Sequence, residues 1–204
     1  MSDGFIIRRG GGSGGGDSNA DFKALVDRSI TEVTADMLKG ATSIGNSAFS
    51  NCINLTSVTI PNSVTSIGNN AFRYCNNLTS VTISNSVTII GNFAFSSCDN
   101  LASIEIPNGV RVIGDQAFQD CYNNLESVTI SSSITSIAFQ AFYGCAELRS
   151  VTVKATTPPT LGGNVFKNTS ANLVIYVPAE SVDAYKASSG WSTYASKIQA
   201  IPSD

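Results

Sequence analysis

Residues 44–66 read IGNSAFSNCINLTSVTIPNSVTS, and the same pattern returns four more times further along the chain. Three apolar positions mark the period: the cysteines lie 23, 23, 23 and 24 residues apart, and phenylalanine and leucine keep the same spacing. A fixed period of about 20–50 residues is typical of a solenoid, in which each repeat forms one coil. The repeated positions are Cys52, Cys75, Cys98, Cys121 and Cys145; Phe49, Phe72, Phe95, Phe118 and Phe142; and Leu55, Leu78, Leu101, Leu125 and Leu148.

The first copy predicts a strand, a turn and a short helical segment. Residues 57–60 (Ser-Val-Thr-Ile) alternate polar and apolar, as a half-buried strand requires. The Pro-Asn pair at residues 61–62 predicts a turn, because proline fixes φ and asparagine tolerates tight conformations. Apolar side chains at residues 48, 49 and 52 would share one side of a short helical turn, with Asn46 as its N-cap.

One such coil cannot bury its apolar side alone, so stability requires stacking against neighbours. Each buried group contributes roughly 1–2 kcal/mol, which offsets the entropy of ordering a coil only when both faces are covered. The ends of the stack therefore need caps. In the second copy, the side chains expected to point inward are Leu78, Val81, Ile83, Val87, Ile90, Ala94, Phe95 and Cys98.

Both ends of the repeat region carry sequences that fit caps. Residues 30–34 repeat the strand pattern without the preceding Phe and Cys, so they begin the strand ladder. Residues 161–177 hold a degenerate sixth copy and a further strand. A helix is expected over residues 179–186, after which Trp191 and Tyr194 would close the apolar end.

The repeated pattern resembles the BspA-type leucine-rich repeat over about residues 29–177, with five clear copies. The resemblance implies a leucine-rich-repeat solenoid of α/β repeat type, dominated by strands. Its coils would be right-handed, with a parallel strand ladder and short helical turns opposite. We accordingly divide the chain into a glycine-rich flexible tether or anchor (1–19), an N-terminal cap (20–43), five repeats (44–160), and a degenerate repeat with a C-terminal cap (161–204).

The charge content argues against nucleic-acid partners and membrane insertion. Only 13% of the residues are charged, and the formal net charge is −3. Phosphate binding needs a basic footprint, and no basic cluster occurs beyond Arg8 and Arg9. The sequence contains no run of about 18 apolar residues, so no membrane-spanning segment is predicted. The residues after Met1 also lack the apolar core of a signal peptide.

Catalysis, metal binding and cofactors are not expected. The chain has no histidine, the commonest general base. Zinc sites need paired Cys-x-x-Cys or histidine ligands, whereas the five cysteines fall one to a coil. An odd number spread in this way also argues against a disulfide framework. We interpret the cysteines as buried small hydrophobic residues and the protein as non-enzymatic.

The outward positions of the predicted strands form the candidate ligand surface. One row consists of serines, and the third repeat departs from its neighbours with Gly109, Glu105 and Arg111, where other copies carry Ser or Thr. These departures mark a ligand contact, or they are drift or protection against edge-to-edge pairing. The candidate ligand residues are Thr59, Thr82, Glu105, Arg111, Thr129 and Thr152.

Asparagines precede the repeated leucines at Asn54, Asn77, Asn100 and Asn124. A ligand role is one interpretation of this row. The other is structural, because asparagine side chains at a fixed turn satisfy backbone groups of a neighbouring coil.

The opening segment has a different composition. Phe5, Ile6, Ile7, Arg8 and Arg9 form a candidate anchor, followed by glycines that behave as a flexible tether. This opening resembles the N-termini of tail-associated proteins of bacteriophages of Gram-positive hosts. An engineered linker or an unstructured leader is the alternative interpretation.

These observations predict a non-enzymatic binding or adhesion module without cofactors. The first hypothesis is a phage or prophage tail-associated protein, located in the virion or, before lysis, in the host cytoplasm. Its repeat surface would bind a protein or glycan on a bacterial cell, and residues 1–16 would bind other virion proteins. The alternative is a bacterial surface or secreted adhesin, located outside the cell, that binds host or matrix proteins. A third possibility is a structural virion or assembly component without an external ligand.

Overall fold

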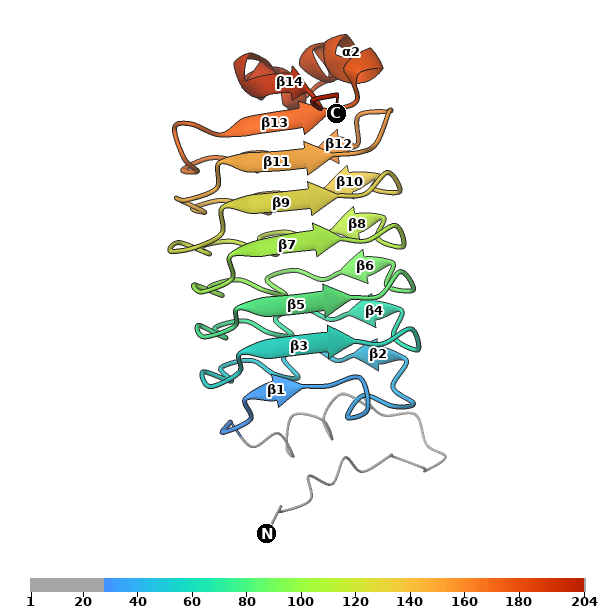
Figure 1. The fold of residues 1–204 in the computed structure, drawn as a ribbon, viewed down its shortest axis with the longest axis vertical. Coiled ribbons are helices and arrows are strands. Elements are labelled where there is room, and N and C mark those ends of the chain that lie inside the picture. The colour runs from blue at the N-terminus through green and yellow to red at the C-terminus, as the bar shows by residue number, and fades with distance from the viewer. Residues whose placement is uncertain (1–27, 204) are drawn as a thin grey trace.

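The computed structural model describes residues 28–203, which form a stack of coils closed by helices at the C-terminal end (Figure 1). The stack has about seven turns of about 23 residues. This confirms the predicted solenoid and extends the five clear repeats by one coil at each end. The proposed tether (1–19) and its anchor residues Phe5 to Arg9 lie outside the described residues, as does the cap sequence up to residue 27.

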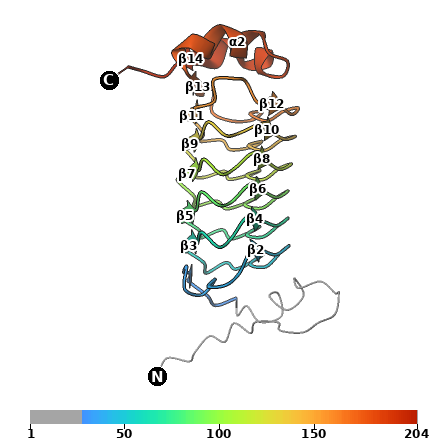
Figure 2. The same cartoon turned by 90° about the vertical axis from the view of Figure 1, so that its right-hand side faces the viewer.

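Two ladders of parallel strands run along opposite sides of the stack (Figure 2). We call the side with the longer strands the main face and the other side the narrow face. The main face contains β1 (Glu32–Val33), β3 (Ser57–Ile60), β5 (Ser80–Ile83), β7 (Ser103–Ile106), β9 (Ser127–Ile130), β11 (Ser150–Val153), β13 (Val174–Val177) and β14 (Ile198–Ala200). The narrow face contains β2 (Ser43–Ile44), β4 (Ser66–Ile67), β6 (Ile89–Ile90), β8 (Val112–Ile113), β10 (Ser136–Ile137) and β12 (Thr160–Leu161).

The apolar residues of the repeat meet between the two faces. In β3, Val58 and Ile60 are buried, whereas Ser57 is half-buried and Thr59 is exposed, as the alternation predicts. One phenylalanine ring from each of six coils packs face to face on the next, along the long axis of the solenoid. Neighbouring ring centroids lie 5.1–5.8 Å apart, and neighbouring planes are within 10° of parallel. The stacked rings are Phe49, Phe72, Phe95, Phe118, Phe142 and Phe166.

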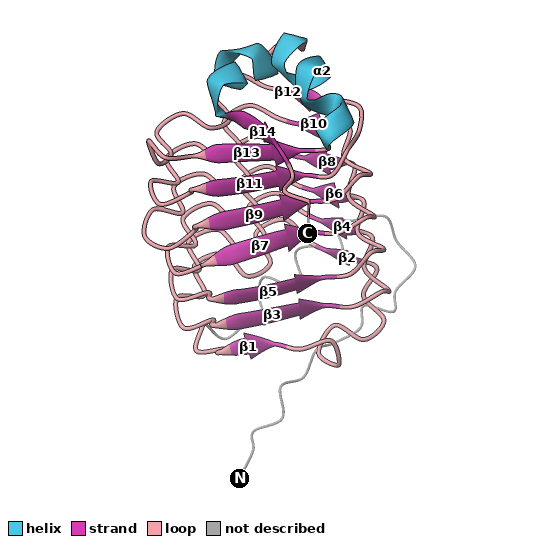
Figure 3. Cartoon of the chain, turned by 45° about the horizontal axis from the view of Figure 1, so that its top comes forward, coloured by secondary structure: helices cyan, strands magenta, loops and turns pink. Residues whose placement is uncertain are grey.

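The expected short helical turn opposite the strands is not helical, and in the described part of the chain the helices lie at the C-terminal end (Figure 3). In the first repeat, Ser47 and Asn51 have φ of 57° and 62°, which interrupts any right-handed helix. The amides of Ser47, Phe49 and Asn51 instead donate to carbonyls of the next coil at 2.7–2.8 Å. We call this part of each coil the turn edge. Its backbone thus forms a third line of contacts between coils.

Asn46 does not cap a helix, contrary to the sequence prediction. Its Oδ1 accepts a hydrogen bond from the backbone amide of Asn69 in the next coil, at 2.8 Å. Asn69 bonds Asn92 in the same way, Asn92 bonds Asp115, and Asp115 bonds Phe139. The residue that the sequence predicted as an N-cap therefore belongs to a ladder of side chains. Each side chain of this ladder accepts a hydrogen bond from a backbone amide of the next coil.

The main face is interrupted between β5 and β7, which do not pair within the described residues. β1, β3 and β5 form one sheet, while β7, β9, β11, β13 and β14 form another, and Figure 1 shows the wider spacing. The narrow face stays continuous from β6 to β8. Val81, predicted to point fully inward, is only half-buried at this break.

One chemical difference coincides with this break. Each of Thr56 and Thr79 donates its hydroxyl to a carbonyl of the preceding coil, at 2.9 and 3.0 Å. The next residues in this row, Ala102, Glu126 and Arg149, have no hydroxyl to donate, although β9 and β11 still pair with their neighbours.

The C-terminal end is closed by η1 (Ala179–Ser181), α2 (Val182–Ala187) and η2 (Trp191–Lys197), where residues 179–186 were predicted as one helix. Trp191 and Tyr185 are fully buried, and their rings meet edge to face with centroids 4.9 Å apart. Each polar group has a partner, because Trp191 Nε1 donates to Pro159 O and the Tyr185 hydroxyl to Ala155 O. Tyr194 packs edge-on against Phe166, the last ring of the stack. The predicted aromatic cap is confirmed.

Candidate binding surface

The outer row of the main face contains most of the residues predicted to bind a ligand. Thr59 lies beside Thr82 in the first sheet. Glu105 lies beside Thr129, which lies beside Thr152, in the second sheet. The first three side chains are exposed and the other two half-exposed. The strand register thus places these five residues in one line, divided by the break between Thr82 and Glu105.

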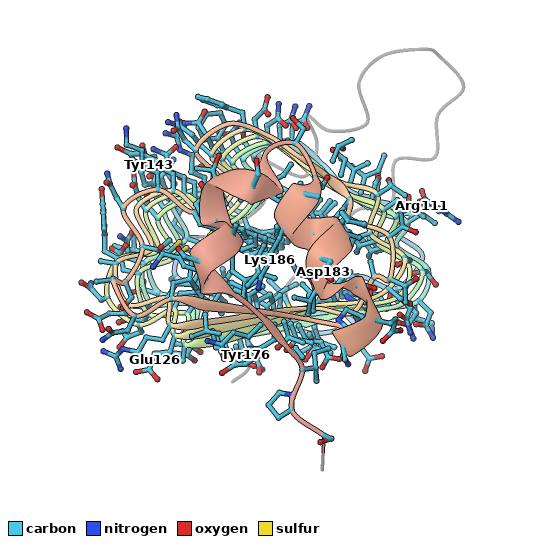
Figure 4. The ribbon with its side chains drawn as sticks, turned by 90° about the horizontal axis from the view of Figure 1, so that it is seen from above. Arg111, Glu126, Tyr143, Tyr176, Asp183 and Lys186 are labelled. Carbon is cyan, nitrogen blue, oxygen red and sulfur yellow. The ribbon has the colours of Figure 1, made fainter. Side chains whose placement is uncertain are left out.

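Arg111 is separated from this row. It lies at the corner before β8, on the way to the narrow face, and Figure 4 shows its side chain on a different side of the coil from Glu126 and Tyr176. The sequence prediction grouped Arg111 with Glu105 because both depart from the repeat consensus. The fold does not bring the two together, because the turn after β7 redirects the chain.

Tyr176 is a surface residue that the sequence reasoning missed. It pairs in register with Thr152 and so continues the outer row into β13, where it is half-exposed. Tyrosine is enriched among the residues that dominate binding energy at protein interfaces. The alternation of Val174 to Val177, with Ile175 and Val177 buried, was the signal that could have identified it.

Charged side chains lie just before the strands of the second sheet, beside the outer row. Arg149, just before β11, lies 3.9 Å from Glu126 and 2.6 Å from Glu147, and its side chain is 55% exposed. Exposed ion pairs contribute about 0–1 kcal/mol to stability. These groups therefore shape the potential at the margin of the row more than they hold the fold.

The five cysteines lie inside the stack, as predicted, and within the described residues no disulfide joins them. The thiol of Cys98 donates to the carbonyl of Phe72 in the preceding coil at 3.3 Å, and Cys75, Cys121 and Cys145 make the equivalent bond. Burial raises the pKa of Cys75 to about 12, helped by its neighbour Cys52. Burial likewise raises the pKa of Cys98 and of Cys145. Such protonated thiols are poor nucleophiles and poor metal ligands.

The asparagine row before the leucines is used for contacts between coils. The side-chain amides of Asn54 and Asn124 donate to backbone carbonyls of the preceding coil, at 3.4 Å in each case. Asn124 also donates to Asn100 Oδ1, which belongs to an amide chain that includes Asn77. These bonds support the structural interpretation of the row.

Residues 28–203 contain neither a metal-binding cluster nor a membrane-spanning helix. Over that range, no three His, Cys, Asp or Glu side chains gather closely enough to hold a metal ion. No helix of the same range combines the length and apolar character needed to cross a bilayer.

Comparison with known proteins agrees with this architecture. A sequence model of the BspA type leucine-rich repeat region matches residues 42–174 in six copies. The solved leucine-rich repeat protein of T. pallidum is 29% identical, with a TM-score of 0.62 over 73% of this chain and 69% of that one. A leucine-rich cell surface protein of Faecalibacterium prausnitzii is 37% identical, with a TM-score of 0.58 over 67% of this chain.

The pneumococcal vaccine antigen PcpA shares the fold alone, at 17% identity and a TM-score of 0.59 over 83% of this chain. The chain spans only 36% of the length of the F. prausnitzii protein and 42% of that of PcpA. A search of curated proteins finds no match.

Proposed function

Because this chain belongs to the BspA-type leucine-rich repeat family, we propose that it is the binding module of a bacterial surface or secreted adhesin. Its ligand would be a protein of a host or of the extracellular matrix. Leucine-rich repeat solenoids are typically binding scaffolds rather than enzymes. The similar protein of F. prausnitzii is described as a cell surface protein, which supports the same location for this chain.

The observation that carries the proposal is the continuous outer row of the second sheet. Glu105, Thr129, Thr152 and Tyr176 lie side by side in register on four neighbouring strands. Their backbone is fixed by ladder hydrogen bonds, so a ligand meets a surface that is already ordered. Binding to such a surface avoids the entropic cost of ordering loops. The row has one carboxylate, that of Glu105 at one end, and one aromatic ring, that of Tyr176 at the other. Its two ends therefore offer a ligand different chemical groups.

A virion role is supported only by the resemblance of the opening segment, which lies outside the described residues. The family and the solved cell-surface relative support the adhesin better. The two hypotheses differ in the surface that is bound: matrix or host protein for the adhesin, and a bacterial cell for the tail protein. One experiment can therefore compare them.

The full chain would be labelled and incubated with plates coated with solubilised extracellular-matrix protein, and separately with washed Gram-positive bacterial cells. The adhesin proposal expects saturable binding to the matrix coat. Replacing both Glu105→Thr and Tyr176→Ser should weaken this binding about fivefold or more, as the loss of interface residues of this kind does. The matched control is Arg111→Thr, which removes an exposed charge from outside the row and should bind as the original chain does.

Binding to bacterial cells without binding to the matrix coat would overturn the adhesin proposal in favour of the tail protein. Equal binding by the double variant and the original chain would overturn the assignment of the row. Circular dichroism of each variant shows whether the fold is kept.

A further inference from the structure

The turn edge of the solenoid carries a cluster of different chemistry from the main face. Six successive coils each have two residues with positive φ in this edge, and the chain fills most of these positions with Asn, Asp, Ser, Gln or Gly. Two exceptions occur, Tyr74 with φ of 62° and Phe93 with φ of 55°. They lie in neighbouring coils and contact the same side chain, that of Arg73.

Large aromatic residues are disfavoured in this left-handed conformation, whereas Asn, Asp and Gly adopt it readily. The fold itself does not need rings at these two positions, because the equivalent positions in other coils are Ser97, Asn70 and Asn51. Backbone strain of this kind is characteristically kept where a side chain has a function. The side chains of Tyr74 and Phe93 are therefore better explained by what they contact than by the turn.

Both rings hold the guanidinium of Arg73. Its Cζ lies 4.6 Å from the centroid of Tyr74 and 4.8 Å from that of Phe93, and Nη1 donates to Asn70 Oδ1 at 3.3 Å. Two cation–π contacts and one hydrogen bond therefore restrict the position of this group. The side chain is half-buried, Nε has no hydrogen-bond partner, and within the described residues Arg73 forms no ion pair. A half-buried cation is thus held in place without an anion.

The surroundings are polar amides with one carboxylate among them, because Asn76 Nδ2 donates to Asp99 Oδ2 at 2.7 Å. Asn77 is exposed and Asn76 half-exposed in the same coil, and the ring of Tyr74 is 38% exposed to solvent. Tyr143 is labelled in Figure 4 and occupies the same repeat position as Arg73, because it follows Phe142 as Arg73 follows Phe72. Its label therefore marks the side of the stack on which the turn edge lies. The edge thus combines an ordered guanidinium, an open aromatic ring and amide groups.

We propose that Arg73, Tyr74 and Phe93 form a binding site for a carboxylate-bearing sugar unit of an acidic glycan. A planar guanidinium held by these contacts suits a planar carboxylate, to which it can donate two hydrogen bonds. The apolar C–H face of the same pyranose ring can pack on the exposed ring of Tyr74, and its hydroxyls can bond to neighbouring amides. An acidic peptide would use the guanidinium alone and leave the ring and the amides without a role. This site is distinct from the main face and does not depend on the matrix-protein proposal.

The test uses the full chain and a hyaluronan oligosaccharide, which alternates glucuronate with N-acetylglucosamine, measured by isothermal titration calorimetry. Chitin oligosaccharide, which lacks the carboxylate, and a poly-glutamate peptide, which lacks the sugar, are the comparison ligands. The original chain should bind hyaluronan in the micromolar to millimolar range and should bind both comparison ligands at least about tenfold more weakly. Arg73→Gln should lower the affinity for hyaluronan about tenfold or more.

Two sets of variants separate binding from folding. Tyr74→Asn and Phe93→Asn replace disfavoured residues with the type preferred at positive φ, so the thermal midpoint should stay equal or rise while hyaluronan affinity falls. Lys167→Gln is the matched charge control, because Lys167 follows Phe166 as Arg73 follows Phe72 and is exposed. It should bind like the original chain.

The proposal is overturned if hyaluronan fails to bind at millimolar concentration or if Arg73→Gln binds as well as the original chain. Equal or tighter binding of the poly-glutamate peptide would identify the partner as an acidic protein and would equally reject a glycan. A loss of matrix binding by the main-face variants, with hyaluronan binding unchanged, would show that the two surfaces act independently.

Discussion

Truncation of the central ring of the phenylalanine stack, Phe95→Ala, should be among the most destabilising single changes in this chain. Phe95 is fully buried, and the centroids of Phe72 and Phe118 lie 5.1 and 5.3 Å away on its two sides. Burial of the side chain contributes about 1.5–3 kcal/mol, and each of two aromatic contacts adds about 0.5–1.5 kcal/mol. The sum, about 2.5–6 kcal/mol, includes the usual cost of this substitution in a core, about 3–5 kcal/mol. The cavity cannot collapse, because strand ladders hold the coils at a fixed spacing.

The measurement is urea and thermal unfolding followed by far-ultraviolet circular dichroism. At about 2–4 °C per kcal/mol for a chain of this size, a loss of about 3–5 kcal/mol should lower the midpoint by roughly 6–20 °C. Phe49→Ala is the matched comparison, because among residues 28–203 the Phe49 ring stacks on one other ring, that of Phe72, and its loss should cost about 1 kcal/mol less. A loss below about 1.5 kcal/mol for Phe95→Ala, or an equal loss for both variants, would refute the claim that the rings stabilise one another across coils.

Three further outcomes are expected. Ala102→Thr should raise the free energy of unfolding by about 0.5–1.5 kcal/mol, since the new hydroxyl can donate to a carbonyl of the preceding coil as that of Thr79 does; an unchanged urea midpoint would argue against the missing bond. Gly109→Ala should lower it by about 1–3 kcal/mol, because a Cβ there would lie 1.9 Å from Asn85 O; full stability would contradict this close approach. Burial raises the pKa of Cys75 from 9.0 to about 12, so the unfolded chain loses this proton at a lower pH than the folded chain does. The thermal midpoint should therefore be highest below pH 9 and decline up to pH 12. If the midpoint of the original chain falls with pH no more than that of Cys75→Ala, the shift is contradicted.

The periodic positions could be predicted from the sequence because identical residues recur where identical contacts are needed. Phe95 and Cys98 are inside for the same reason in every coil, and the strands follow from alternation. Trp191 and Tyr194 were predictable as a cap because an apolar stack must end in something that covers it. These inferences needed only local pattern and the cost of exposed apolar surface.

The remaining features depend on contacts between coils, which periodicity does not reveal. A pattern of Asn followed by an apolar pair fits an N-cap as well as a ladder, and only the bond from Asn69 N to Asn46 Oδ1 distinguishes the two. The left-handed residues have mixed identity, from Ser47 to Phe93, so no glycine signal marks them. Glu105 and Arg111 were grouped by departure from consensus, but the turn between them separates their side chains.

The strict coil-to-coil register has a consequence for how such proteins change over generations. Ser57 pairs with Ser80 on one face and Ile67 with Ile90 on the other, each 23 positions apart. Loss or duplication of one whole coil at the level of the gene therefore rejoins partners of the same kind and leaves the interior continuous. Descendants can therefore differ in length along the stack by steps of one strand spacing, about 4.8 Å. The 24-residue interval between Cys121 and Cys145 shows that a single extra residue is also accommodated, because Ser103 still pairs with Ser127 and Ser136 with Thr160.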